Sequence, residues 1–142
     1  YYDMLTHLNN RNSYMEQLND WKQTGLDRVG GIYIDLNGLK KMNDTQGHEA
    51  GDALICRVAQ ALEAVFPQRA YRIGGDEFVV VQPDISQTAF TAKVQQLRAE
   101  MQQREVSAAV GAVWQQHTND VEALLRRADD CMYQEKQQMK QL

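Results

Sequence analysis

The sequence predicts an α+β fold in which a mostly antiparallel central sheet is covered by helices. Two kinds of periodicity lead to this prediction, because segments with apolar residues at helical spacing are interspersed with segments that have the period of a strand. Together they give the order helix, strand, helix, hairpin, helix, strand, helix. The hairpin is indicated by the pair Gly74-Gly75, which lies between two short apolar runs.

The helical spacing of apolar residues predicts helices at about residues 12–24, at residues 47–66, after Ser86 and after Asn119. Gly25 should end the first of these helices, because glycine is a common helix stop. Ser86 is a suitable cap for the third helix. Asn119 and Glu122 have the spacing of a capping pair, so we expect them to open the last helix.

Alternating or continuous apolar residues predict strands at residues 28–36, 70–73, 78–81 and 106–114. In the first of these, Ile32 and Ile34 alternate with Tyr33 and Asp35, which is the pattern of a half-buried strand. Pro67 and Pro83 each close a periodic segment, and the loops between segments are short. We therefore expect residues 1–142 to form a single domain.

The composition excludes several classes of protein. The 142 residues carry a formal net charge of -4, spread evenly along the chain, which argues against a non-specific nucleic-acid binder. The mean hydropathy of -0.58, without an apolar run of about 18 residues, excludes a membrane span within this segment. The chain opens Tyr1-Tyr2-Asp3 without an initiator Met, so we expect it to be a C-terminal fragment of a longer protein.

The hairpin turn is the first candidate for chemistry. Gly74 and Gly75 lack side chains and would let the backbone approach a bulky ligand closely. Asp76 and Glu77 follow at once, and two adjacent carboxylates in a tight place are favoured when a cation lies between them. An ordinary solvated turn is the alternative interpretation.

Asp35 is the second candidate, because it interrupts an apolar strand. A buried carboxylate without a partner is strongly disfavoured, so Asp35 needs a basic side chain or a metal ion. Arg72 is one possible partner, and a divalent ion shared with Asp76 is the other. A salt-bridged or strand-edge aspartate without a catalytic role is the plain alternative.

A polar block that follows the first strand and extends into the second predicted helix is the third candidate. Asn43 and Asp52 have donors and acceptors suited to a base edge, and an aspartate matches the N1–H and exocyclic amine of guanine. Lys40 can neutralise a phosphate. Each of these residues, like His48, also has a purely structural interpretation as a turn, cap or surface residue.

These blocks resemble the GGDEF domain family, which is named after the motif found here within residues 72–78. Residues 3–11 resemble the opening motif of the family, with His7 where glycine is usual. Residues 34–52 resemble its central block, and residues 128–136 resemble its closing helix. The resemblance covers essentially the whole chain.

The resemblance implies a diguanylate cyclase, which condenses two GTP into cyclic di-GMP and releases two pyrophosphates. It also implies a fold similar to nucleotidyl cyclases and polymerase palms. By matching position, Asp35, Asp76 and the carbonyl of Leu36 would bind two Mg²⁺ (or Mn²⁺) ions per active site. Asp76 would help to activate the ribose 3′-hydroxyl, and we count Asp76 and Glu77 as the catalytic residues.

The substrate-binding residues implied by the resemblance come from several blocks. They are Asn43 and Asp52 for guanine, with His48 nearby, Lys40 and Lys136 for the phosphates, and Gly74 and Gly75 at the turn. Each domain would hold one GTP, so a homodimer is required for catalysis. We expect an upstream sensory or regulatory domain and no nucleic-acid partner. This domain is expected at the cytoplasmic face, whether or not the full-length protein is anchored in the inner membrane.

The sequence departs from the family pattern at several positions. Asn37 replaces a frequent Asp, and Leu39 replaces a common Phe. Residues 139–141 read Met-Lys-Gln where Gly-Arg-Asn is usual, so Lys140 would replace an Arg phosphate contact without its bidentate fork. The Arg-x-x-Asp product-inhibition site is absent, because residues 65–68 read Val-Phe-Pro-Gln. We therefore expect no feedback inhibition through that site.

Two alternatives to this function stay open. One is a catalytically weak or inactive GTP-binding GGDEF domain that regulates an attached or partner domain. The other is a cyclase for a different or mixed cyclic dinucleotide, against which Asp52 counts as a guanine reader. The intact hairpin motif, together with Asp35 and Asn43, favours the diguanylate cyclase.

Overall fold

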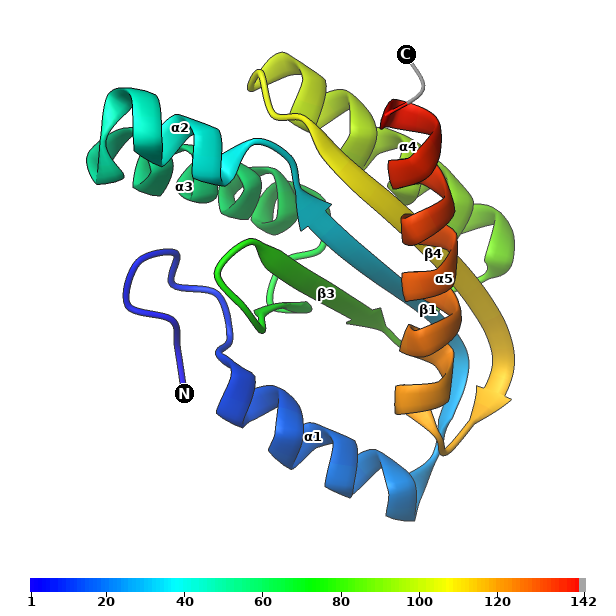
Figure 1. Ribbon diagram of the computed structural model, residues 1–142. Coiled ribbons are helices and arrows are strands. Elements are labelled where there is room, and N and C mark those ends of the chain that lie inside the picture. Colours follow the sequence, from blue (N-terminus) through cyan, green and yellow to red (C-terminus); the bar gives the residue numbers. More distant parts are fainter. Residues whose placement is uncertain (141–142) are drawn as a thin grey trace.

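The structure is a computed structural model, and residues 1–140 of the chain are described. Helices and strands follow one another in the order drawn in Figure 1. The helices are α1 (Arg11–Thr24), α2 (Leu39–Gln46), α3 (His48–Val65), α4 (Gln87–Gln103) and α5 (Val121–Lys140). The strands are β1 (Leu26–Leu36), β2 (Ala70–Arg72), β3 (Glu77–Gln82) and β4 (Ala108–Thr118).

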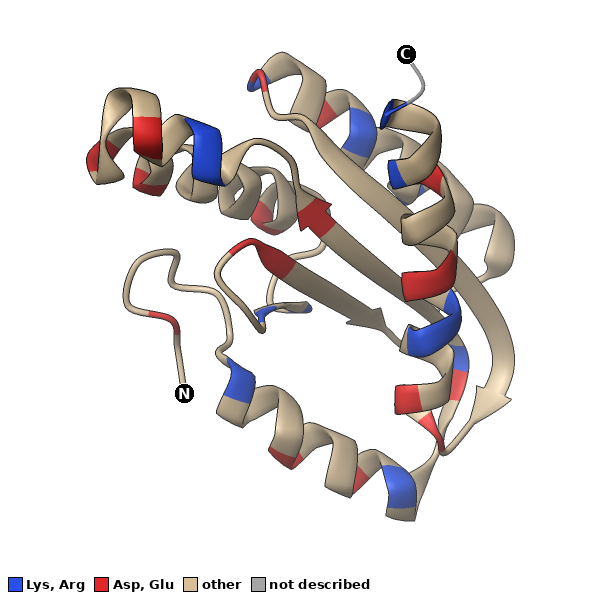
Figure 2. Cartoon of the chain, in the orientation of Figure 1, with Lys and Arg blue, Asp and Glu red and all other residues tan. Residues whose placement is uncertain are grey.

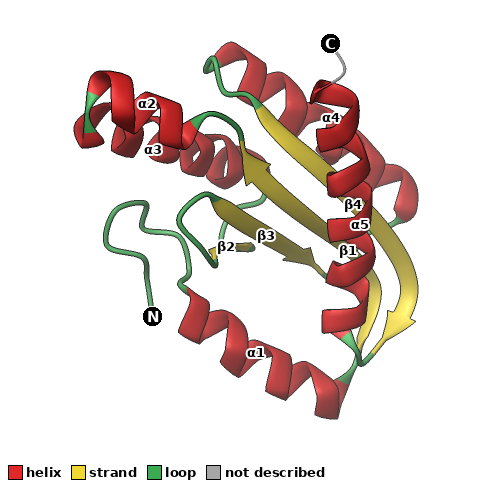
Figure 3. Ribbon diagram, in the orientation of Figure 1, coloured by secondary structure: helices red, strands yellow, loops and turns green. Residues whose placement is uncertain are grey.

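The strands form a four-stranded sheet in the order β2-β3-β1-β4. All pairs in this sheet are antiparallel, which confirms the predicted fold class. Figure 3 shows the sheet with helices on both of its faces. In the central strand β1, Asp35 is opposite Glu77 of β3 on one side and Ala109 of β4 on the other.

The alternation of β1 divides the core into two layers. Ile32 and Ile34 are fully buried in a cluster with residues of α3 and α4. Val29 and Tyr33 point to the opposite face, where α1 and α5 supply the packing. Asp35 has the same parity as Tyr33, so its side chain projects on the α5 side of the sheet. Helix α5 lies across β4 and β1 on this face (Figure 1).

Most predicted elements are confirmed, and the differences have local causes. Helix α2 was not predicted, because it has eight residues and only Leu39 and Met42 pack, partly buried, against the core, which is too short an apolar pattern to indicate a helix. It begins after Gly38, which adopts a left-handed conformation with φ of 77°. The last predicted strand is displaced, since β4 begins at Ala108 and continues to Thr118.

The predicted helix ends are correct in two cases and wrong in one. Gly25 ends α1 with φ of 70°, and the Ser86 side chain accepts a hydrogen bond from the Ala89 amide at 3.1 Å. The capping pair of Asn119 and Glu122 is wrong, because Asp120 caps α5 instead. Its carboxylate accepts a hydrogen bond from the amide of Ala123 at 3.0 Å.

None of the helices within residues 1–140 combines the length and the apolar character needed to cross a membrane.

Candidate active site

The turn between β2 and β3 is closed by the backbone. The amides of Ile73 and Gly74 both donate to the carbonyl of Glu77, at 3.0 and 3.3 Å. Neither Gly74 nor Gly75 has a positive φ, so both glycines matter through their missing side chains. A Cβ on Gly74 would lie 3.1 Å from Glu77 Oε1, while a Cβ on Gly75 would meet nothing within 4 Å. The outer side of the turn is therefore open to a ligand.

The turn brings Asp76 to the end of β1. The amide of Leu36 donates to the carbonyl of Asp76 at 2.9 Å, which joins the turn to the strand that carries Asp35. Partial burial raises the pKa of Asp76, and the negative charge of Asp35 raises it further. The two carboxylates that the sequence analysis paired are thus close enough to repel each other.

Asp35 has one satisfied and one unsatisfied oxygen. The Lys136 ammonium, from α5, contacts Asp35 Oδ2. Asp35 Oδ1 is buried and has no hydrogen-bond partner within residues 1–140. The interpretation of Arg72 as the basic partner of Asp35 is wrong, because Lys136 takes that place. A carboxylate with a cation on one oxygen and a bare second oxygen is suited to bind a metal ion.

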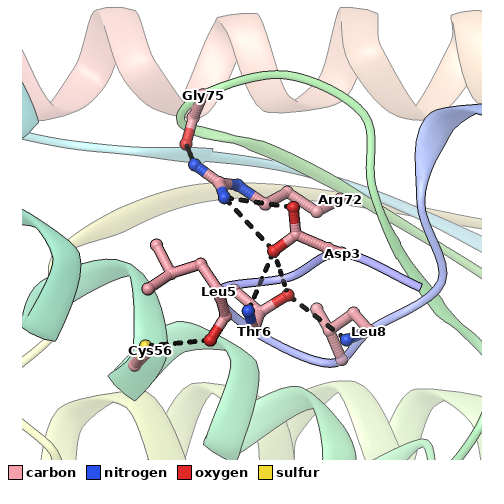
Figure 4. Close-up of polar contacts among 7 residues, drawn as sticks. All are labelled: Asp3, Leu5, Thr6, Leu8, Cys56, Arg72 and Gly75. Atoms are coloured by element: carbon pink, nitrogen blue, oxygen red, sulfur yellow. Dashed lines mark hydrogen bonds and ion pairs between the residues drawn. The ribbon is translucent and has the colours of Figure 1, made fainter.

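Arg72 instead connects the N-terminal segment to the Gly-Gly turn, as Figure 4 shows. Arg72 Nη1 contacts the carboxylate of Asp3 at 3.2 Å, and Arg72 Nη2 donates to the carbonyl of Gly75 at 2.9 Å. Thr6 donates to Asp3 Oδ2 through its amide at 2.9 Å and its hydroxyl at 2.7 Å. The position of the turn therefore depends on residues near the start of the chain.

Glu77 points into an acidic region that includes a residue the sequence analysis missed. The Tyr33 hydroxyl donates to Glu77 Oε2 at 2.8 Å, which orients this carboxylate. Burial raises the pKa of Asp129 on α5, and Glu77 and Asp35 add to this effect. Figure 2 shows acidic segments at the end of β1 and at the start of β3, and a further acidic segment on α5 where this helix covers the sheet. Asp129 lies within residues 128–136, which resemble the closing helix of the family, but only the packing of α5 shows that it joins this acidic region.

Side chains alone do not build a metal site among residues 1–140, since no group of three or more His, Cys, Asp or Glu residues is placed to hold an ion. The site predicted from the sequence, made of Asp35, Asp76 and the main-chain carbonyl of Leu36, has only two side-chain ligands and is therefore not a cluster of this kind.

The α2–α3 pair carries the residues predicted to bind the base. Asn43 lies against Gly51, because a Cβ on residue 51 would overlap with Asn43 Oδ1. The structure therefore brings Asn43 of α2 against α3 at Gly51, the residue before Asp52 in the sequence. Asp52 is exposed, and so are Lys40 and His48 on the same helix pair. Since α2 begins just beyond the end of β1, this group lies at the same end of the sheet as Asp35.

Two departures from the family pattern have structural roles of their own. Asn37 Nδ2 contacts Ser107 Oγ at 3.1 Å and Met139 Sδ at 3.4 Å, so it ties the end of β1 to the last turn of α5. Leu39 packs against the core cluster. Lys140 is exposed at the end of α5, and Gln141 lies outside the described residues.

The segment at the place of the product-inhibition site belongs largely to the core. Val65 and Phe66 are 3% and 0% exposed, and Lys93 Nζ donates to the carbonyl of Val65 at 3.1 Å. Gln68 is exposed and its backbone amide donates to Glu63 Oε1 at 3.3 Å. None of these four positions carries the arginine or the aspartate of the Arg-x-x-Asp motif.

The fold and the site define a palm-like α+β domain in which a Gly-Gly turn brings Asp76 to the strand that carries Asp35. The family model for "Diguanylate cyclase, GGDEF domain" matches residues 1–142, and the chain belongs to this family. The cyclic di-GMP phosphodiesterase PdeR of Escherichia coli (strain K12) is 34% identical over 148 residues, covering 95% of this chain and 22% of PdeR. The diguanylate cyclase DgcS of Shewanella oneidensis is 32% identical over 145 residues, covering 95% of this chain and 49% of DgcS. The chain thus spans less than half the length of these curated relatives.

Solved structures agree with this assignment. The GGDEF domain of TpbB (YfiN) from Pseudomonas aeruginosa is similar with a TM-score of 0.79 and 28% identity, covering 97% of this chain and 90% of that one. The GGDEF domain of DgcB from Caulobacter crescentus, solved in complex with c-di-GMP, has a TM-score of 0.81 and 24% identity, covering 96% and 90%. The second likeness concerns the fold alone.

Proposed function

We propose that this domain is a diguanylate cyclase that condenses two GTP into cyclic di-GMP with release of two pyrophosphates. The observation that carries the proposal is the meeting of Asp35 and Asp76 at the end of β1, where one oxygen of Asp35 contacts Lys136 and the other has no partner in the described part of the chain. Family membership and the likeness to DgcS support the same activity.

The residues at this place fit a divalent cation. Asp35, Asp76 and the carbonyl of Leu36 would hold two Mg²⁺ (or Mn²⁺) ions, which prefer such oxygen ligands. When bound, the ions lower the pKa of the ribose 3′-hydroxyl and balance the charge of the pyrophosphate leaving group. Without them, the raised pKa of Asp76 reflects the cost of placing its charge in a partly buried site beside Asp35.

The other residues bind and orient the nucleotide. Asp52 accepts hydrogen bonds from the N1–H and the exocyclic amine of guanine, and Asn43 pairs with the base edge from α2. His48 lies nearby, and Lys40 neutralises phosphate charge on the same helix pair. The bare backbone at Gly74 and Gly75 leaves room for the triphosphate beside the turn.

Two residues complete the charge arrangement around the reacting groups. Lys136 would neutralise phosphate charge, since a cation held by Asp35 would leave its ammonium free for the phosphates. Glu77, oriented by the Tyr33 hydroxyl, keeps a second carboxylate beside Asp76 and assists it in catalysis.

Catalysis requires two copies of the domain. Each copy offers one base-binding pair, Asn43 and Asp52, and one acidic turn, so one GTP is bound per copy. Two such domains facing each other bring each 3′-hydroxyl to the other nucleotide, and control of the homodimer by an attached regulatory domain is a natural switch.

The test is a product assay on a forced dimer, in which the chain is fused to a parallel coiled coil. The protein is incubated with GTP and Mg²⁺, the products are separated by chromatography, and Asp76→Asn serves as the control. Cyclic di-GMP from the unsubstituted dimer alone is the expected result. A forced dimer that binds GTP without forming product would instead establish a GTP-binding regulatory domain.

A further inference from the structure

Both backbone groups of Val110 on the outer strand β4 are satisfied by side chains. The Val110 amide donates to Glu135 Oε2 at 2.6 Å, and Arg98 Nη2 donates to the Val110 carbonyl at 3.4 Å. Arg98 Nη1 and Glu135 Oε1 are 2.8 Å apart, which closes the ring. Val110 is 2% exposed and β4 has no strand on its outer side, so these two side chains replace a missing strand.

The ring fixes α5 next to a second point of close contact. A Cβ on Gly111 would overlap with the carbonyl of Ala128 and the amide of Met132, so the backbone of α5 rests directly on β4 there. Ala128, Met132 and Glu135 recur at helical spacing and therefore lie on one face of α5. Gly111 allows the short distance between α5 and β4. The bond from the Val110 amide to the Glu135 carboxylate fixes the position of α5 along its own axis and its rotation about that axis.

Lys136 follows Glu135 directly. Its target Asp35 is opposite Ala109, the neighbour of Val110 on β4, so the ring and the ion pair are adjacent in the sheet as well as in the helix. A slip of α5 by one residue would shift it by about 1.5 Å and turn it by about 100°, which would carry the ammonium away from Asp35.

We infer that Glu135 and Arg98 are positioning residues for Lys136, which they direct toward Asp35 and the nucleotide phosphates. The inference rests on the proposed function, in which Lys136 contacts those phosphates. Neither residue touches the substrate itself, and both act by fixing the last turns of α5 on the edge of β4.

The experiment measures the affinity of the chain for a non-hydrolysable GTP analogue with Mg²⁺ by calorimetry. Glu135→Ala should weaken binding by about tenfold, as loss of a group that orients a ligand residue does. Glu135→Gln should weaken it less, because its amide oxygen still accepts from Val110. Arg104→Gln is the matched control, since Arg104 pairs with Glu100 within the α4 region and contacts neither α5 nor β4 in the described interactions.

A double-mutant cycle separates positioning from general damage. In a Lys136→Ala background, Glu135→Ala should cause no further loss of analogue binding, because the residue through which it acts is already gone. Hydrogen exchange of the Val110 amide should quicken in Glu135→Ala and stay unchanged in Lys136→Ala. Arg98→Gln, which retains the Glu135–Val110 bond, provides a second variant should Glu135→Ala fail to fold.

The inference would be overturned if Glu135→Ala, or Arg98→Gln, weakened analogue binding equally in the presence of Lys136 and in the Lys136→Ala background. It would also be overturned if neither Glu135→Ala nor Arg98→Gln changed the affinity for the analogue. An unsubstituted protein that does not bind the analogue would overturn the proposed function together with this inference. A protein that binds the analogue independently of Glu135 and Arg98 would leave the proposed function intact and reject only their role.

Discussion

The ammonium of Lys136 contacts one carboxylate oxygen of Asp35, while the other oxygen is buried and has no partner among the residues that the structure describes. The lysine side chain is 28% exposed and the aspartate side chain 17%, so the pair lies mostly out of water. Lys136 thus supplies the positive charge that Asp35 needs at the place proposed for a metal ion. A cation that binds Asp35 must compete with Lys136.

This competition predicts opposite effects of Lys136→Gln on the two ligands. The Mg²⁺ concentration that gives half-maximal binding should fall, because the ammonium no longer occupies Asp35. The affinity for a GTP analogue should decrease by about tenfold or more, because a charged hydrogen bond to phosphate is lost. Calorimetric titrations with each ligand measure both values.

Lys22→Gln is a suitable control for this prediction, since Lys22 is an exposed lysine that faces Glu122 of α5 at 3.9 Å. It should change neither titration beyond the small effect of a surface charge. Weaker binding of both Mg²⁺ and the analogue to Lys136→Gln would contradict the competition.

Asp76→Asn should stabilise the metal-free domain while it abolishes cyclase activity. The pKa of Asp76 is raised in the folded state by burial and by Asp35. The folded state therefore binds the proton of Asp76 more tightly than the unfolded state does. The stability that this proton contributes is fully present below the ordinary pKa of 3.8 and is lost as the pH rises through the pKa of the folded state. At pH 7 the ionised carboxylate opposes folding, and Asn removes that charge.

Thermal unfolding at a series of pH values, with and without Mg²⁺, measures this effect. The advantage of Asp76→Asn should be present at pH 7 and should shrink toward pH 3.8 and below, whereas Mg²⁺ should raise the Tm of the unsubstituted protein only. Asp20→Asn on the exposed side of α1 serves as the control. An Asp76→Asn variant that is less stable at pH 7 without metal would refute the argument.

Gly51→Ala should impair nucleotide binding without loss of stability. The added Cβ would overlap with the Asn43 side-chain oxygen, so the amide must turn away from its place against α3. The displaced group is the end of a side chain, and alanine improves helix propensity by about 1 kcal/mol, so the free energy of unfolding should change little. Affinity for the GTP analogue and urea unfolding measure the two effects.

Asn43→Ala is the companion variant, because it removes the overlapping atom. In that background, Gly51→Ala should cause no further loss of affinity. A Gly51→Ala protein that binds the analogue as tightly as the unsubstituted chain would show that Asn43 does not act from this position.

The sequence alone predicted which elements carry the residues of this site better than it predicted which side chains contact them. Alternation along β1 placed Asp35 in a strand, and the Gly-Gly pair placed Asp76 on a turn, because both signals are local. The Lys136–Asp35 contact joins residues 101 positions apart, and no local pattern distinguishes it from the Arg72 alternative. Helix α2 was not predicted because it is short and mostly polar, and only Leu39 and Met42 pack against the core from it.

Asp3→Asn should loosen the Gly-Gly turn and destabilise the domain in a pH-dependent way. Burial alone would raise the pKa of Asp3, but hydrogen bonds from Thr6 and the charge of Arg72 outweigh it and lower the pKa. The folded state therefore prefers the ionised carboxylate. The stability that this provides is present above the ordinary value of 3.8 and is lost as pH falls through the folded pKa.

Urea unfolding at pH 7 should show Asp3→Asn to be less stable by about 1–2 kcal/mol, because Arg72 loses its charged partner in a half-buried site. The difference should narrow as the pH falls below 3.8 and Asp3 itself becomes protonated. Asp20→Asn, on the exposed side of α1 and away from the turn, should not show this convergence. A destabilisation by Asp3→Asn that persists undiminished below the folded pKa would mean that packing, and not the ionised carboxylate, connects the N-terminal segment to Arg72 and the carbonyl of Gly75.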